Sequence, residues 1–72
     1  MHSNAFAVRL RACRLSAELT QEQLALRAGL HPSAISHFES GRRTPSLDNL
    51  IYLVQALGVS ADRLLGTEAR RG

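Results

Sequence analysis

Polar side chains that can form hydrogen bonds recur at helical spacing near the middle of the chain. Ser33 is followed after three, four and seven residues by Ser36, His37 and Ser40. This spacing places all four side chains on one face of a helix. Ala34, Ile35 and Phe38 fall on the opposite face. Hydroxyl and imidazole groups can bond to base edges in the major groove of DNA or to phosphates. An ordinary solvent-facing helix uses the same residue types, but the absence of charge on this face favours a binding surface.

Serine, histidine and cysteine could also serve catalysis or bind a metal, and the sequence argues against both. His2, Cys13, His31 and His37 lack the close ligand spacing of a structural metal site, such as a Cys-x-x-Cys pair. No glycine elbow, phosphate-binding loop or carboxylate pair accompanies the serines. We therefore expect no active site, no metal and no cofactor, and we place Cys13 in the core.

The composition describes one small, basic module. The chain has 72 residues, 44% of them hydrophobic, and its net charge of +3 comes from arginine alone, since lysine is absent. The whole positive excess lies before Thr44, which suits a polyanionic partner. Cys13 has no second cysteine to pair with, so we expect a reducing, cytoplasmic setting. The longest apolar run, Leu50 to Val54, is too short to cross a membrane.

Start and stop signals divide the chain into helical segments, and no alternating strand pattern competes with them. The clearest start is the Thr20-x-x-Gln23 capping box, with Leu19 and Leu24 as a hydrophobic staple. The helix that it opens is expected to stop at Gly29, a residue type that accepts the left-handed conformation.

Four further helices are expected around this one. The first follows the candidate caps Ser3 and Asn4 and ends near Ala17. The third runs from Pro32 to about Ser40, with His31 a poor cap and Ser33 sharing the capping role. The fourth follows Ser46 and stops at Gly58, and the fifth follows Ser60 and stops at Gly66. The predicted fold is all-α, a compact five-helix bundle over residues 1–66 with a helix-turn-helix at its second and third helices. Residues 67–72 are expected to form a flexible tail.

Several separated motifs give the chain a family resemblance. Between about residues 6 and 66 it resembles the lambda-repressor-like (Cro/C1, Xre-type) helix-turn-helix family, which implies a five-helix bundle that binds operator DNA as a dimer. The motifs are Thr20-Gln21-Glu22-Gln23-Leu24-Ala25, Ala28-Gly29-Leu30, Ile35-Ser36, Glu39-Ser40-Gly41, Pro45-Ser46, Leu50 and Ala56-Leu57-Gly58-Val59-Ser60.

The resemblance implies a role for individual residues. Base contacts are expected from Pro32, Ser33, Ser36 and His37. Phosphate contacts are expected from Gln21, Ser40, Arg42, Arg43 and Arg11. An intramolecular ion pair is expected between Arg14 and Glu39. Pro32 lacks a donor and Ser33 is short, so we expect few direct base contacts and a dominant share of affinity from phosphates.

The sequence thus predicts a regulator that binds double-stranded DNA at a roughly palindromic operator as a homodimer, a repressor or a controller of a neighbouring gene. Leu26, Tyr52 and Leu65 are candidates for a dimer contact or for a patch that binds another protein. Two alternatives stay open: an antitoxin-like module whose main partner is a protein, and the N-terminal DNA-binding domain of a longer regulator. No membrane partner is expected.

Overall fold

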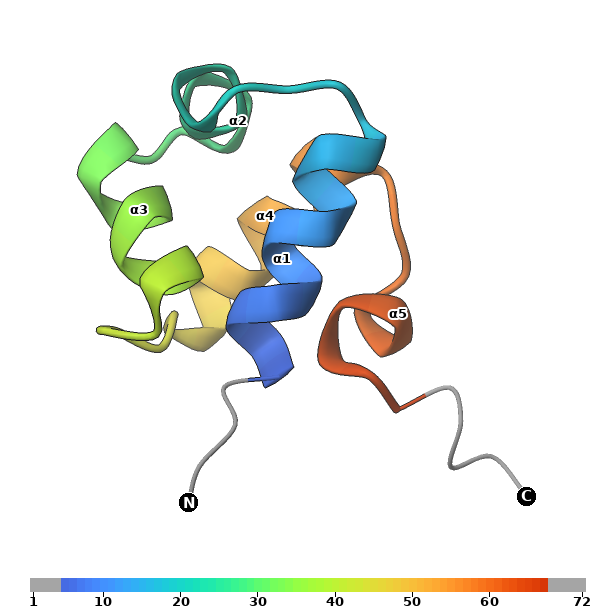
Figure 1. Cartoon of the computed structure of the whole chain (residues 1–72). Helices are drawn as coiled ribbons and strands as arrows, with labels where there is room; N and C mark the ends of the chain where they lie inside the picture. Colours follow the sequence, from blue (N-terminus) through green and yellow to red (C-terminus); the bar gives the residue numbers. More distant parts are fainter. Residues whose placement is uncertain (1–4, 68–72) are drawn as a thin grey trace.

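The computed structural model describes residues 5–67, and in this range the fold is entirely helical, as predicted. In chain order the helices are α1 (Ala5–Ser16), α2 (Gln21–Ala28), α3 (Pro32–Ser40), α4 (Leu47–Leu57) and α5 (Ala61–Leu65) (Figure 1). The candidate caps Ser3 and Asn4, and the tail beyond Thr67, lie outside the described residues. Within that range no helix is both long and apolar enough to cross a bilayer.

Local hydrogen bonds explain where the helices begin and end. At α2, the Gln23 backbone N–H donates to Thr20 Oγ1 over 3.0 Å, and the Thr20 N–H donates to Gln23 Oε1 over 2.9 Å, which completes the predicted capping box. Gly29 ends α2 in the left-handed conformation at φ 72°, where a side chain would be strained. The tight link from Gly29 to His31 therefore turns the chain directly from α2 into α3.

A single core holds the helices together. Every helix contributes one fully buried aliphatic side chain to it: Leu10, Leu24, Ile35, Leu53 and Leu64. Cys13 joins them as a buried free thiol, as expected. Because the core draws on all of these helices at once, none of them can be removed without exposing apolar surface to water.

The packing leaves α3 at the side of the bundle. α3 packs against α1 and α2, whereas α5 packs against α1 and α4. Figure 1 shows α3 and α5 on opposite sides of α1. One long side of α3 is consequently free of other helices.

Two details tie α1 to its neighbours along the chain and in space. The Arg9 guanidinium occupies the place that a side chain at Gly66 would take, so α1 packs closely on the end of α5. At the other end of α1, Glu18 has φ 60°, a left-handed conformation that its neighbours fix through hydrogen bonds from Glu18 N–H to Leu15 O and from Leu19 N–H to Arg14 O. Glu18 thus holds a conformation that favours glycine.

We expect Glu18→Gly to stabilise the fold. Removing the side chain relieves the left-handed strain, so the free energy of unfolding should rise by about 1 kcal/mol and the melting temperature by roughly 4–8 °C. The matched control is Gly58→Ala. Gly58 has φ 68° and an added Cβ would meet no atom within 4 Å, so this reverse change should lower stability through backbone strain alone. Thermal unfolding followed by circular dichroism measures both, and a lower melting temperature for Glu18→Gly would contradict this account.

Candidate nucleic-acid interface

The polar face of α3 lies at the surface because the opposite face is anchored in the core. Ile35 and Phe38 are buried, whereas the hydroxyls of the polar face belong to exposed residues. These residues are Ser33, Ser36 and Ser40. Pro32 is also exposed at the start of the helix. The predicted division of α3 into an apolar side and an outward hydrogen-bonding side is therefore present.

His37 departs from this simple picture. The residue is half-buried, and its Nδ1 is buried without a hydrogen-bond partner. Successive residues of a helix are rotated by about 100°. This rotation places His37 at the edge of the polar face, beside the half-buried Ala34, and places Ser33 and Ser40 near the centre of that face. The prediction that His37 belongs to the outward polar face is thus met only in part, and Nε2 is the ring nitrogen left for a ligand.

His31, a poor cap by residue type, is nevertheless the N-cap of α3. Its Nδ1 accepts a hydrogen bond from the Ser33 backbone N–H over 3.1 Å and lies 2.9 Å from Ser33 Oγ. The sequence signal for this role is weak because serine, threonine, aspartate and asparagine are the usual caps. Ser33 contacts the cap through its hydroxyl instead of replacing it.

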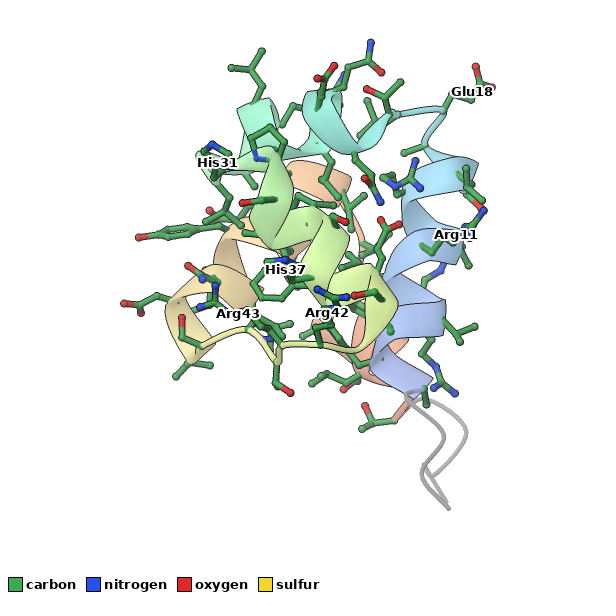
Figure 2. The ribbon with its side chains drawn as sticks, turned by 60° about the vertical axis from the view of Figure 1, so that its left-hand side comes forward. Arg11, Glu18, His31, His37, Arg42 and Arg43 are labelled. Atoms are coloured by element: carbon green, nitrogen blue, oxygen red, sulfur yellow. The ribbon has the colours of Figure 1, made fainter. Side chains whose placement is uncertain are left out.

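The turn after α3 positions two arginines. The backbone N–H groups of Arg42 and Arg43 donate to His37 O over 3.0 and 3.3 Å, and both residues are exposed. Figure 2 shows them beside His37 at the end of α3. Ser40 Oγ donates to the same carbonyl over 3.1 Å, so a phosphate would have to compete with this bond for the Ser40 hydroxyl.

Exposed positive charge lies on both flanks of α3. In Figure 2, Arg43 lies on one side of the helix and Arg11, on α1, lies on the other. Arg14 does not add to this charge, because it is buried. The uncharged helix face is thus flanked by guanidinium groups, an arrangement that suits a groove bordered by phosphates.

The buried Arg14 joins α1 to α3. Its Nε donates to Glu39 Oε2 over 2.6 Å, its second terminal nitrogen donates to Glu39 Oε1 over 3.0 Å, and its first donates to Leu19 O over 2.8 Å. The hydrogen bond to Glu39 raises the pKa of the Arg14 guanidinium, burial opposes that rise, and Coulomb attraction adds to it. This is the ion pair that the family resemblance implies.

Gln21 extends the same network. Its Nε2 donates to Glu39 Oε1 over 3.2 Å, and the residue is half-buried at the first position of α2. The hydrogen bond assigns the amide orientation and leaves the second N–H of Nε2 for another acceptor. Sequence reasoning placed Gln21 near a phosphate but did not find its link to Glu39, since no local pattern joins residues so far apart.

The apolar residues proposed for a contact with a second chain are exposed. Leu26 on α2 is 84% exposed, and Tyr52 on α4 and Leu65 on α5 are each 45% exposed. The structure adds Leu47 and Ile51, which share one face of α4. Their spacing of four residues is visible in the sequence, but α4 is apolar on so many sides that periodicity alone does not distinguish its outer face.

Among residues 5–67, no group of three histidine, cysteine or acidic side chains could hold a metal ion. The cysteine and histidines weighed as ligands have other places: Cys13 is in the core, His31 caps α3 and His37 lies beside Ala34 at the edge of the polar face. His2 lies outside the described range. The chemistry that the arrangement supports is hydrogen bonding and ion pairing at an exposed surface.

Comparison with known proteins agrees with this geometry. The protein-family model described as Helix-turn-helix matches residues 10–64. The control protein C.BamHI of Bacillus amyloliquefaciens is 43% identical over 61 residues, which are 83% of this chain and 75% of that protein.

Solved structures show the same fold. The restriction-modification controller protein C.AhdI of Aeromonas hydrophila superposes with a TM-score of 0.81 at 38% identity, covering 83% of this chain and 91% of that one. The DNA-binding domain of the P22 c2 repressor superposes with a TM-score of 0.83 at 32% identity, covering 100% of this chain and 96% of that one. The chain spans only about half the length of several curated relatives that it matches.

We expect Arg14→Met to destabilise the fold strongly. The substitution leaves the Glu39 carboxylate, whose side chain is 5% exposed, without its cationic partner, so the free energy of unfolding should fall by about 3–5 kcal/mol. The double variant Arg14→Met with Glu39→Met should lose less, because it removes both charges and retains apolar volume. Urea unfolding of Arg14→Met, Glu39→Met and the double variant measures the coupling, and single losses that simply add to the double loss would argue against an energetically coupled pair.

Proposed function

The chain belongs to the helix-turn-helix family, and from this premise we propose that it is a transcriptional regulator that binds double-stranded DNA with α3 in the major groove. The observation that supports this proposal is the exposed polar side of α3 between two flanks of arginine. α3 is held against the bundle by Ile35 and Phe38, so its polar side chains are presented without a large rearrangement. Membership in a family of transcription regulators also argues against an enzymatic role for this chain.

Base recognition is assigned to the start and middle of α3. Pro32 offers apolar contact, Ser33 and Ser36 offer hydroxyls, and His37 offers Nε2. Short side chains make few base contacts, and each well-placed bidentate pair that longer residues would form is worth about 1–3 kcal/mol of discrimination. Sequence preference therefore depends also on how easily the DNA adopts the bound shape.

Phosphate contacts supply most of the affinity in this proposal. Arg42 and Arg43 lie at the end of α3, Arg11 lies on its other flank, and Gln21 offers its remaining amide N–H. Ser40 contributes only if its hydroxyl leaves His37 O. Each neutralised phosphate should steepen the fall of affinity with salt by about 0.9 in the logarithmic slope.

The proposed assembly is a homodimer on a roughly palindromic operator. Two copies of α3 would enter major grooves about 34 Å apart, one helical turn of DNA. Tyr52 and Leu65, together with Leu26, are the proposed contact residues. An operator that overlaps a promoter would make the chain a repressor or a controller of a neighbouring gene. Similar proteins are a control protein, an immunity repressor and a restriction-modification controller protein.

Two substitutions separate base reading from phosphate binding. His37→Ala should narrow the affinity gap between the selected operator and unrelated DNA, because it removes a base contact. Arg43→Ala should weaken binding to every duplex by a similar factor and reduce the salt slope by about 1. Electrophoretic mobility shifts at several salt concentrations measure both effects, after operator selection from a random duplex pool. Binding that does not change with salt would contradict the proposal.

The dimer is tested by charge placed in the proposed contact. Tyr52→Asp and Leu65→Asp should each shift the chain toward monomer, since an ionised carboxylate resists burial. The control is Val8→Asp on α1, which changes a residue that is 70% exposed and outside the proposed contact. Sedimentation equilibrium at micromolar concentration measures the state of each variant. An unsubstituted chain that remains monomeric with operator DNA would overturn the dimer.

A further inference from the structure

We propose that Ser33 recognises an exocyclic amino group of the operator, adenine N6 or cytosine N4, because His31 fixes the direction of the Ser33 hydroxyl proton. This inference rests on the proposed function, in which the start of α3 lies in the major groove. It assigns Ser33 a defined base chemistry and makes His31 a positioning residue that acts through Ser33.

The proton positions follow from two distances at one nitrogen. The Ser33 backbone N–H lies 3.1 Å from His31 Nδ1, and a backbone N–H can only donate. Nδ1 must therefore be the unprotonated nitrogen of the ring, and the neutral imidazole carries its proton on Nε2. Ser33 Oγ lies 2.9 Å from the same Nδ1. In the tautomer with an unprotonated Nδ1 the hydroxyl is the donor of this contact, and it shares the single Nδ1 lone pair with the backbone N–H.

While its proton points to Nδ1, the Ser33 hydroxyl offers only lone pairs to an outside group, and a base acceptor would first have to break the bond to His31. Ser33 is exposed, and its Oγ retains two lone pairs. In the major groove the only hydrogen-bond donors on the bases are the amino groups of adenine and cytosine, whereas guanine O6 and N7 and thymine O4 accept. The fixed proton thus matches Ser33 to an amino group and mismatches it with an acceptor.

Ser36 provides an internal comparison on the same helix. It is exposed like Ser33, but within the part of the chain that the structure describes its hydroxyl has no hydrogen-bond partner. Its proton is free to rotate, so Ser36 can donate or accept. Of these two serines, Ser33 alone is expected to have a one-directional preference.

The experiment begins with operator selection by the full chain, followed by selection with Ser33→Ala and with Ser36→Ala. The base pair whose preference disappears in Ser33→Ala identifies the Ser33 contact, and we expect adenine or cytosine there. Replacing that base with an analogue that lacks the amino group, purine for adenine or 2-pyrimidinone for cytosine, should weaken binding of the unsubstituted chain about threefold to tenfold. The same replacement should leave Ser33→Ala binding unchanged.

The role of His31 is tested by its effect on preference. His31→Ala frees the hydroxyl, so thymine or guanine should become acceptable at the Ser33 position. His31→Asn retains a side-chain acceptor at the N-cap and should restore the amino preference. Circular dichroism at the assay temperature establishes that each variant is folded, and a variant that is not is measured at a lower temperature.

Three results would overturn the proposal. The first is a Ser33-dependent preference for thymine or guanine, the second is a Ser33→Ala chain that selects the same operator, and the third is a His31→Ala chain that weakens on all duplexes without a change of preference. In each of these the proposed function stands. A chain that enriches no duplex from the pool overturns the proposed function instead.

Discussion

The ion pair between Arg14 and Glu39 is the interaction on which the presentation of α3 depends. It is formed where three parts of the chain meet, because Arg14 also donates to Leu19 O at the entry to α2 and Glu39 also accepts from Gln21. Both charges are largely removed from water, so each depends on the other to offset the cost of burial. α3, which carries the proposed binding surface, is thereby fixed to α1 and α2 by directional bonds as well as by apolar packing.

A nine-residue helix could not maintain this position alone, since isolated helices of that length are marginal in water. The chain compensates with local and distant constraints. At the start of α3, His31 Nδ1 accepts a hydrogen bond from a backbone N–H. At the end of α3, the His37 carbonyl accepts hydrogen bonds from backbone N–H groups of the following turn. Between these ends, Ile35 and Phe38 provide the apolar contact. The surface residues that we propose for DNA binding are therefore positioned by groups that do not themselves need to contact DNA.

The predictability of each feature follows the range of the interaction behind it. Helix limits could be predicted because Thr20, Gln23 and the stop at Gly29 act within a few residues of one another. The exposed hydroxyls of α3 followed from its periodicity. The sequence carried only a weak signal for the cap at His31, whose residue type is unusual in that role. It carried none for the inward Nδ1 of His37 or for the bond from Gln21 to Glu39, which depend on side-chain geometry and on a distant partner.

The single core, to which every helix contributes a fully buried aliphatic side chain, has a thermal consequence. Because the helices share these contacts, melting one of them would expose apolar surface on its neighbours, and small domains of this kind unfold in an all-or-none transition. The surface of α3 would then disappear over the same narrow temperature interval as the rest of the bundle. Heating is therefore expected to remove the exposed polar side of α3 and the rest of the fold in a single transition.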